Sequence, residues 1–189
     1  MRDVTQLSDL IFARLRGLAF SFLGQTKFKL IGRQFKYYGI RHIRGTEISA
    51  GDNCWFEAVT SYRGHRYDPS LVLGVRSMFS GAVHISAVRR IQIGADCLFG
   101  SNIYVGDHSH GTTDPVRLDP NVPPASRALD DIAEIGIGDR VWIGDGVVIL
   151  AGSRIGDGCV IGANSVVKGD FPSPAIIAGI PARVVKELA

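Results

Sequence analysis

Two histidines stand close together in the run Asp107-His108-Ser109-His110-Gly111. An imidazole has an ordinary pKa near ~6.5, so it takes up and releases a proton around neutral pH. Such a group can act as a general base that withdraws the proton of an attacking hydroxyl, which accelerates a reaction roughly 10²–10⁴-fold. Asp107 either accepts an N–H from an imidazole and fixes its orientation, or serves as a turn residue. The sequence therefore offers a histidine base at position 108 or 110.

The segments that position these histidines follow a period of six residues. Between residues 137 and 167 an aliphatic residue stands at every sixth position, and glycine usually follows it. The same period holds at Ile93, Phe99 and Val105, and more weakly between Leu73 and Ile91 before a slip of two residues. The aliphatic positions of the strict tract are Ile137, Ile143, Ile149, Ile155, Ile161 and Val167.

A period of six does not match the 3.6-residue turn of an α-helix. It matches a short extended segment with one aliphatic residue pointing inward, followed by a tight corner. The pairs Asp139-Arg140, Asp145-Gly146 and Asp157-Gly158 and the residue Asn164 fall at such corners, where glycine and asparagine tolerate a positive φ. Stacked coils of this kind bury a continuous aliphatic column and pair each backbone with the next coil. The repeat predicts an all-β protein, a parallel β-helix.

Two segments depart from the period. Residues 1–36 are expected to form an N-terminal helical or irregular segment, in which Leu10, Ile11, Leu15, Leu18 and Phe22 have helical spacing. Residues 25–72 are expected to hold irregular lead-in strands and a first incomplete coil. This helix either packs on the β-helix or between subunits, or lies on a membrane surface. The β-helix domain is expected over residues 37–187, with one long external loop at 111–134 that is rich in Pro, Asp and Arg. Loops that interrupt a rigid scaffold often carry function.

The Ile-Gly hexads and the closing stretches 168–172 and 178–183 resemble the hexapeptide-repeat acyltransferases, in particular the maltose, galactoside and polysaccharide O-acetyltransferases. The resemblance covers roughly residues 73–187, and more loosely it begins at Ile43. It implies a left-handed β-helix, although parallel crossovers in general are right-handed. Serine acetyltransferases end similarly, but they carry a long helical N-terminal region for which this chain is too short.

The resemblance also implies a catalytic histidine at the start of the loop that leaves the coils. Counting without gaps from Ile93-Gly94 places this base at His110, and His108 is the alternative. In the maltose and galactoside enzymes an Asn and an Asp line the acceptor pocket, whereas Ser80 and Val88 stand at the matching positions here. Other nearby residues would replace these contacts. The expected acceptor-binding residues are Ser80, His84 and Arg89, with Arg90 beside them.

On the cofactor side the family contacts the pantetheine arm through backbone groups at small residues. The matching positions are Gly144, Asp145 and Ala163. Trp142 matches an aromatic residue at the thioester end, or else it caps the core. The cations expected to meet the CoA phosphates, by charge-assisted bonds, are Lys168, Arg183 and Lys186.

The resemblance thus implies an acetyl-CoA-dependent O-acetyltransferase that acts on a sugar hydroxyl of a surface polysaccharide or its precursor and assembles as a homotrimer. Three alternatives stay open. Transfer to the nitrogen of an amino sugar and a non-catalytic scaffold both suit the fold. A zinc carbonic anhydrase also shares it, but His84, His108 and His110 do not have the spacing of that site.

Composition indicates the class of protein and the compartment in which it works. With 46% apolar and 21% charged residues and a net charge of +3, the chain has the composition of an ordinary globular protein and not of a nucleic-acid-coating one. Cys54, Cys97 and Cys159 are far apart and form no CxxC pair, which argues against disulfides or structural zinc and favours a reducing cytoplasm. We expect no metal and no nucleic-acid partner. The expected location is cytoplasmic, with a possible peripheral place at the inner membrane face through the N-terminal segment.

Overall fold

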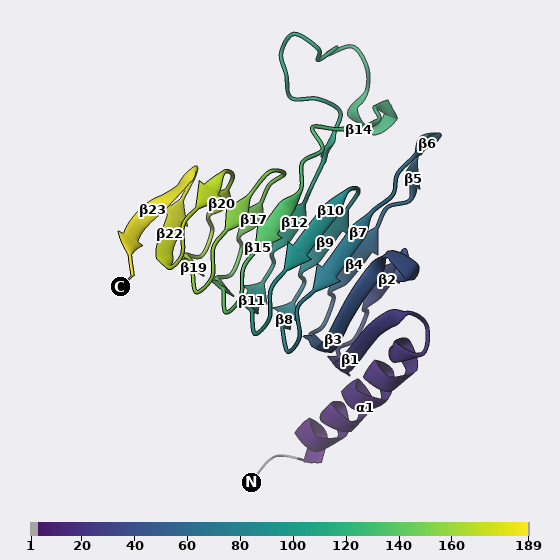
Figure 1. Cartoon of the computed structure of the whole chain (residues 1–189). Helices are drawn as coiled ribbons and strands as arrows, with labels where there is room; N and C mark the ends of the chain where they lie inside the picture. The colour runs from purple at the N-terminus through teal and green to yellow at the C-terminus, as the bar shows by residue number, and fades with distance from the viewer. Residues whose placement is uncertain (1–3, 189) are drawn as a thin grey trace.

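The computed structural model describes residues 4–188, in which stacked coils with three faces follow an N-terminal helix (Figure 1). The helix α1 spans Val4–Ser21. The long strands β1 (Gln25–Ile31) and β3 (Ile43–Ala50) pair in parallel, and each bends from the first face of the coils to the second. Because of this bend, both faces belong to one 13-stranded sheet.

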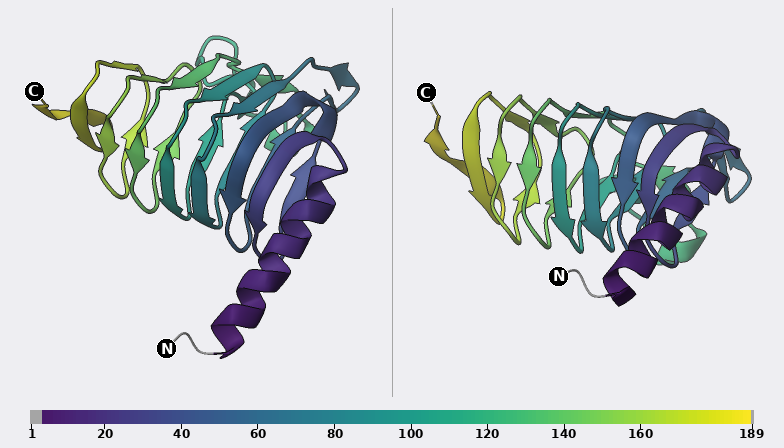
Figure 2. Two further views of the ribbon diagram at one scale, coloured as in Figure 1. Left: turned by 60° about the horizontal axis from the view of Figure 1, so that its bottom comes forward. Right: turned by 90° about the horizontal axis from the view of Figure 1, so that it is seen from below.

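Successive coils lie side by side along the axis, as both views in Figure 2 show. Face 1 continues from β3 through β7 (Ser70–Leu73), β10 (Arg90–Ile93), β15 (Ile135–Ile137), β18 (Arg154–Ile155) and β21 (Asp170–Phe171). Face 2 continues through β8 (Met78–Gly81), β11 (Leu98–Ser101), β16 (Trp142–Ile143), β19 (Val160–Ile161) and β22 (Ala175–Gly179). Face 3 is the 6-stranded sheet of β2 (Lys36–Tyr38), β4 (Trp55–Ala58), β9 (His84–Ala87), β12 (Tyr104–Gly106), β17 (Val148–Ile149) and β20 (Val166–Val167).

The remaining elements interrupt or end the coils. The hairpin β5 (Ser61–Tyr62) and β6 (His65–Arg66) leaves the coils after β4, and a short 3-10 helix, η1 (Ile40–His42), precedes β3. The external loop leaves after β12; it contains η2 (Pro124–Ser126), and its base is closed by β13 (Ser109–His110) against β14 (Leu129–Asp130). The last strand, β23 (Ala182–Glu187), runs antiparallel to β22. The predicted fold, a parallel β-helix with an N-terminal helix and one long external loop, is confirmed.

The core is the inward column that the hexads predict. Ile143, Ile149 and Val167 are fully buried, and so are Phe99 and Val105 in the earlier tract. Smaller inward residues fill the space near the corners, where the Ser153 hydroxyl donates to the Leu150 carbonyl oxygen at 2.6 Å. Cys54, Cys97 and Cys159 are buried and unpaired, and burial raises the pKa of each thiol.

The corners explain why Asp and Asn recur in the repeat. Arg140, Gly146, Gly158 and Asn164 all have positive φ, between 56° and 70°. The Asp residue beside a corner accepts a backbone N–H from the preceding coil. The distances are 2.8 Å from Ala95 to Asp139, 2.6 Å from Ser101 to Asp145 and 2.9 Å from Asp139 to Asp157. Each corner therefore satisfies a donor of the coil before it.

The N-terminal end differs from the prediction in its boundary. β1 already pairs with β3, so the first coil begins at Gln25 and the expected boundary between residues 36 and 37 falls inside β2. The period could not locate this coil because its strands lack hexads. α1 lies against β1, where Gly17 is buried and a Cβ there would lie 3.2 Å from the Phe28 carbonyl oxygen. The Arg16 Nε donates to the Ile31 carbonyl oxygen at 2.9 Å, which fixes the helix on the coil.

Candidate active site

The external loop leaves the coils at Asp107, whose carboxylate is fully buried. Its two oxygens accept the backbone N–H groups of Val88, Arg89 and Arg90, each at 2.8 Å. These three residues form the corner that follows β9 in the preceding coil. The side chain therefore does the work of a corner residue, as one of the two sequence interpretations proposed.

The same carboxylate also contacts His108. The Nδ1 of His108 lies 3.1 Å from the Asp107 Oδ1, and only 6% of the His108 side chain is exposed. Asp107 therefore holds the corner and also contacts His108 in the way that a base-orienting carboxylate does. A carboxylate that accepts Nδ1–H leaves the Nε2 lone pair of the same ring to accept a proton.

His110 has a different environment. It lies on β13, is exposed, and pairs with Leu129 across the base of the loop. Its ring meets the edge of Tyr62 from the β5–β6 hairpin at a centroid distance of 5.5 Å, and the His108 ring lies 6.4 Å away. Tyr62 could not be identified from the sequence, because the hairpin lies outside the repeat.

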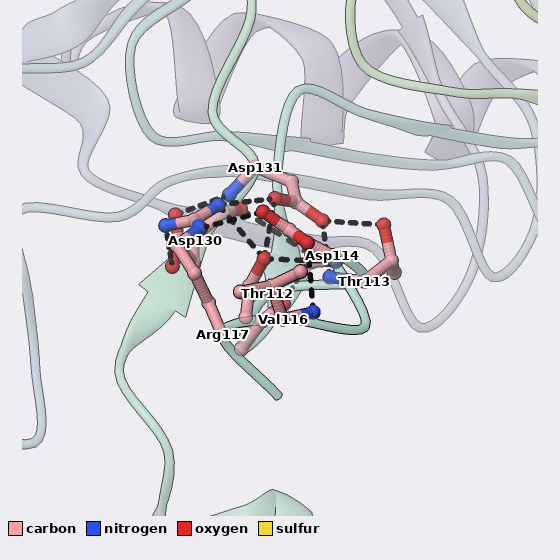
Figure 3. Close-up of polar contacts among 9 residues, drawn as sticks. Thr112, Thr113, Asp114, Val116, Arg117, Asp130 and Asp131 are labelled. Carbon is pink, nitrogen blue, oxygen red and sulfur yellow. Dashed lines mark hydrogen bonds and ion pairs between the residues drawn. The ribbon is translucent and has the colours of Figure 1, made fainter. Parts of the chain in front are cut away.

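The start and the end of the loop are held together by a network of charges (Figure 3). Arg117 contacts Asp114, Asp130 and Asp131 at 3.3, 3.2 and 3.3 Å. Asp131 also accepts the backbone N–H and the hydroxyl of Thr113, both at 2.6 Å. Hydrogen bonds from Thr113, together with the Arg117 charge, lower the pKa of Asp131. These contacts give the loop a defined shape where it joins the coils.

The expected acceptor residues do not all come together within one chain. His84 lies on face 3, and the Arg89 backbone N–H is bonded to Asp107, while its side chain pairs with Glu134 at 3.2 Å. Ser80 lies at the end of β8 on face 2. Ser80 and His84 therefore lie on different faces of the coils.

Sequence reasoning named His84 as an acceptor-binding residue but missed the aromatic side chains beside it on the outer surface of face 3. Trp55, His84 and Tyr104 occupy equivalent positions on β4, β9 and β12. The Trp55 and His84 rings stack at 4.2 Å, and the Tyr104 ring meets His84 at 5.4 Å. Glu57 accepts from the His84 Nε2 at 3.2 Å. The period identifies inward positions only, so the pairing of coils was needed to find this cluster.

On the cofactor side, Gly144, Asp145 and Ala163 lie at adjacent corners between faces 2 and 3. A Cβ on Gly144 would lie 2.8 Å from the Ala163 nitrogen, so the two coils approach closely there. The Asp145 side chain is engaged by the Ser101 N–H. Trp142, on face 2, is 54% exposed and does not cap the core.

The three expected phosphate-binding cations are not together in one chain. Arg183 and Lys186 lie on β23, which pairs with β22 on face 2. Lys168 follows β20 on face 3 and is exposed. Among residues 4–188, no group of three or more His, Cys, Asp or Glu side chains is placed to hold a metal ion.

Comparisons with known proteins place the chain in a family. The family model described as "Bacterial transferase hexapeptide (six repeats)" matches residues 134–169, and that described as "Hexapeptide repeat of succinyl-transferase" matches residues 90–108. A chloramphenicol acetyltransferase of Morganella morganii is 33% identical over 144 residues, which are 64% of this chain and 69% of the relative. The chain belongs to the hexapeptide-repeat acyltransferases.

Two further proteins are similar to this chain. A protein of Escherichia coli (strain K12) that is provisionally named lipopolysaccharide biosynthesis O-acetyl transferase WbbJ is 44% identical over 108 residues. That match covers 56% of this chain and 54% of the relative, so the chain spans about half the length of that relative. The structure of a galactoside acetyltransferase in complex with coenzyme A has a TM-score of 0.54 at 23% identity, covering 95% of this chain and 82% of that chain. This second likeness supports the fold alone.

Proposed function

We propose that this hexapeptide-repeat protein is an acetyl-CoA-dependent O-acetyltransferase that acts on a sugar hydroxyl of a surface polysaccharide or its precursor. The observation that carries the proposal is the contact between Asp107 and His108 at the base of the loop, at 3.1 Å. A base needs a partner that orients it, and among the loop histidines of the described chain His108 has a carboxylate partner. We therefore assign the base to His108 instead of His110, which lies exposed against Tyr62.

In the proposed reaction the His108 Nε2 takes the proton of the acceptor hydroxyl as its oxygen attacks the thioester carbonyl carbon. The carbon–sulfur bond then breaks, and the imidazolium returns the proton to the leaving thiolate of CoA. Asp107 is the positioning residue, which accepts Nδ1–H and stabilises the positive ring. The products are the acetyl ester of the sugar and free CoA.

Acetyl-CoA is proposed to lie along the corner of Gly144 and Ala163, whose small side chains leave backbone groups accessible to the pantetheine arm. Trp142 lies nearby on face 2. Arg183 and Lys186 on β23 would bind the phosphates of CoA. Lys168, which follows β20 on face 3, would bind them from that face. Replacing any of the three cations by Ala should raise the KM for acetyl-CoA and leave the KM for the acceptor nearly unchanged. A higher acceptor KM instead would contradict the assignment.

A homotrimer is part of the proposal, and an apolar column on face 2 supports it. Register pairs align outward-pointing side chains of β8, β11, β16, β19 and β22. Met78, Leu98 and Trp142 in this column are 52%, 42% and 54% exposed. A contiguous apolar surface of this kind marks an interface, and a second copy would also bring Ser80 of one chain toward His108 of another. Light scattering that finds a stable and active monomer would rule out the shared site.

The proposed location is cytoplasmic, with weak association at the inner membrane face through α1. Ile11, Leu15 and Leu18 are exposed on α1, and Phe22, which directly follows the helix, is 88% exposed. Arg14, Lys27 and Lys29 nearby are exposed, and none of them forms an ion pair within the described residues 4–188. An apolar helix face flanked by cations suits an anionic lipid surface. None of the described helices is long and apolar enough to span a bilayer.

The function is tested by acetyl-CoA turnover against nucleotide sugars, free oligosaccharides and lipid-linked oligosaccharides, with amino sugars in the same panel. We expect CoA release that depends on a hydroxyl acceptor and a product that carries an ester. An amide product would replace the proposal with N-acetyl transfer. Turnover with no member of the panel would favour the non-catalytic alternative.

The membrane association has its own test. The wild type should co-sediment with vesicles that contain anionic phospholipid, and Leu15→Glu should lose most of this binding. Val116→Glu is the matched control, because Val116 is an apolar side chain on the loop that is 90% exposed. If Leu15→Glu instead dissociates the oligomer and the wild type does not bind vesicles, α1 is a contact between subunits.

A further inference from the structure

The outer surface of face 3 changes character along the coils. At one register position, β2, β4, β9 and β12 present Lys36, Trp55, His84 and Tyr104, whereas β17 and β20 present Val148 and Val166. The aromatic and polar positions therefore end at the coil from which the loop leaves. A scaffold has no need for this difference, since the inward residues of β4, β9, β12, β17 and β20 are buried and apolar throughout.

A second register position on the same strands adds a carboxylate. Tyr38, Glu57, Ser86 and Gly106 are aligned there, and Asp107 and His108 follow Gly106 directly. Burial raises the pKa of Glu57, but hydrogen bonds from His84 and Ser86 and the charges of His84 and His108 outweigh it, so the pKa is lowered. Glu57 therefore carries its negative charge at neutral pH and lies within electrostatic reach of His108.

The Tyr104 side chain points toward Gly106, next to Asp107 and His108. Its hydroxyl lies over Gly106, where any Cβ would overlap it. Burial raises the pKa of Tyr104, and the charges of Glu57 and Asp107 raise it further, so the phenol stays a protonated donor. Within residues 4–188 its hydroxyl has no hydrogen-bond partner in the protein.

A second donor in the cluster also lacks a partner. The indole nitrogen of Trp55 is buried, and it has no hydrogen-bond partner among the described residues. A buried donor without a partner costs roughly 1–3 kcal/mol, and each such group in a native structure calls for an explanation. A bound ligand with hydroxyl oxygens would supply an acceptor for Tyr104, whereas the Trp55 nitrogen is closed to solvent and would be reached only after a local rearrangement.

We infer that Glu57, Tyr104 and Trp55 form the subsite that binds the acceptor, a pyranose whose hydroxyl next to the acetylated one donates to Glu57. The inference rests on the proposed function. A sugar ring offers C–H faces that pack on an aromatic ring and hydroxyls that pair with a carboxylate and a phenol. Tyr104 provides a ring and a phenol, and Glu57 provides the carboxylate. The Trp55 ring, which already contacts His84 and the Lys36 ammonium, borders them. Because His108 follows directly, a ring bound there presents a neighbouring hydroxyl to the base.

The kinetic test uses the conservative variants Glu57→Gln and Tyr104→Phe. Hydrogen bonds to a charged group contribute enough that Glu57→Gln should raise the acceptor KM about 10–100-fold, and Tyr104→Phe should raise it about 2–10-fold. The KM for acetyl-CoA should not change. Glu47→Gln, at an exposed position on β3, is the matched control and should behave as the wild type. An unchanged acceptor KM in both variants overturns the subsite.

A binding test separates this inference from the proposed function. The chain has two tryptophans, so the variant Trp142→Phe leaves Trp55 as the sole tryptophan reporter. Its fluorescence should change when an acceptor sugar from the turnover panel is titrated without acetyl-CoA, and Glu57→Gln should weaken that binding. Sugar binding that Glu57→Gln does not affect overturns the subsite while turnover still supports the function. Sugar binding that depends on Glu57, in a protein without acetyl transfer, overturns the proposed function but not the subsite.

Discussion

Face 3 shows one strand pattern used for two purposes. In the early coils the outward positions hold Trp55, His84 and Tyr104, and in the late coils the same positions hold Val148 and Val166. The inward neighbours are buried and apolar in both regions. Because side chains alternate between the two sides of a strand, the outward residues can change without disturbing the core. If the proposed subsite binds the acceptor, alternate residues of the same short strands serve stability and substrate binding.

The largest expected effect tests the site at the end of the early coils. His108→Ala should reduce kcat about 10²–10⁴-fold while acetyl-CoA still binds, because the lost contact acts mainly in the transition state. His110→Ala should be milder. Steady-state kinetics measure kcat, and calorimetric titration with CoA measures whether the cofactor still binds. If His110→Ala is the inactive variant, the base is the exposed histidine at the base of the loop; if both variants keep near-normal kcat, the mechanism fails.

The second prediction tests the inward positions of the late coils. Ile143 is fully buried on β16, so Ile143→Ala should lower the free energy of unfolding by about 2–5 kcal/mol through lost transfer energy and a cavity. Arg154→Ala, on the outward side of β18, should change it by less than about 0.5 kcal/mol. Denaturant unfolding at fixed protein concentration measures both. Equal effects would contradict the division between inward and outward residues.

The third prediction compares two outward glycines. Gly106→Ala must displace the Tyr104 hydroxyl, whereas a Cβ on Gly136 would meet nothing within 4 Å. We expect Gly106→Ala to raise the acceptor KM several-fold, on the order of the Tyr104→Phe effect, with little change in stability. Gly136→Ala should leave the acceptor KM unchanged. The same variants assayed for acetyl-CoA KM exclude a general distortion of the coil.

The smallest effect concerns the loop. The pKa of Asp131 is lowered in the folded protein, chiefly by hydrogen bonds from Thr113. The ionised carboxylate therefore favours the ordered loop above the ordinary Asp pKa of about 3.9, and this contribution is lost as the pH falls through the lower folded pKa. Amide exchange should show the Thr113 N–H less protected at acid pH, while coil amides such as that of Ile143 stay protected. Asp131→Asn should remove the pH dependence at Thr113.

The hexads predicted the coils, the corners and the place of the loop, because each of these follows from local spacing. Positive φ at Asn164 and the burial of Ile149 needed no knowledge of distant residues. The first coil was expected only as irregular lead-in strands, because β1 and β2 lack the period and their places are fixed by pairing with β3 and β4. The Glu57–His84 contact and the three N–H groups on Asp107 join different coils, so the stacking had to be known first.

The two ends of the stack of coils affect whether chains can add to one another. A stack of parallel coils ends in open strand edges, which can template the addition of another chain. Here α1 covers β1 at one end, and β23 turns back antiparallel on β22 at the other. The outer side of β23 carries the exposed charges of Arg183 and Lys186, which oppose further pairing. A chain that lost β23 would be expected to polymerise end to end, so the last strand acts as a chain terminator for assembly.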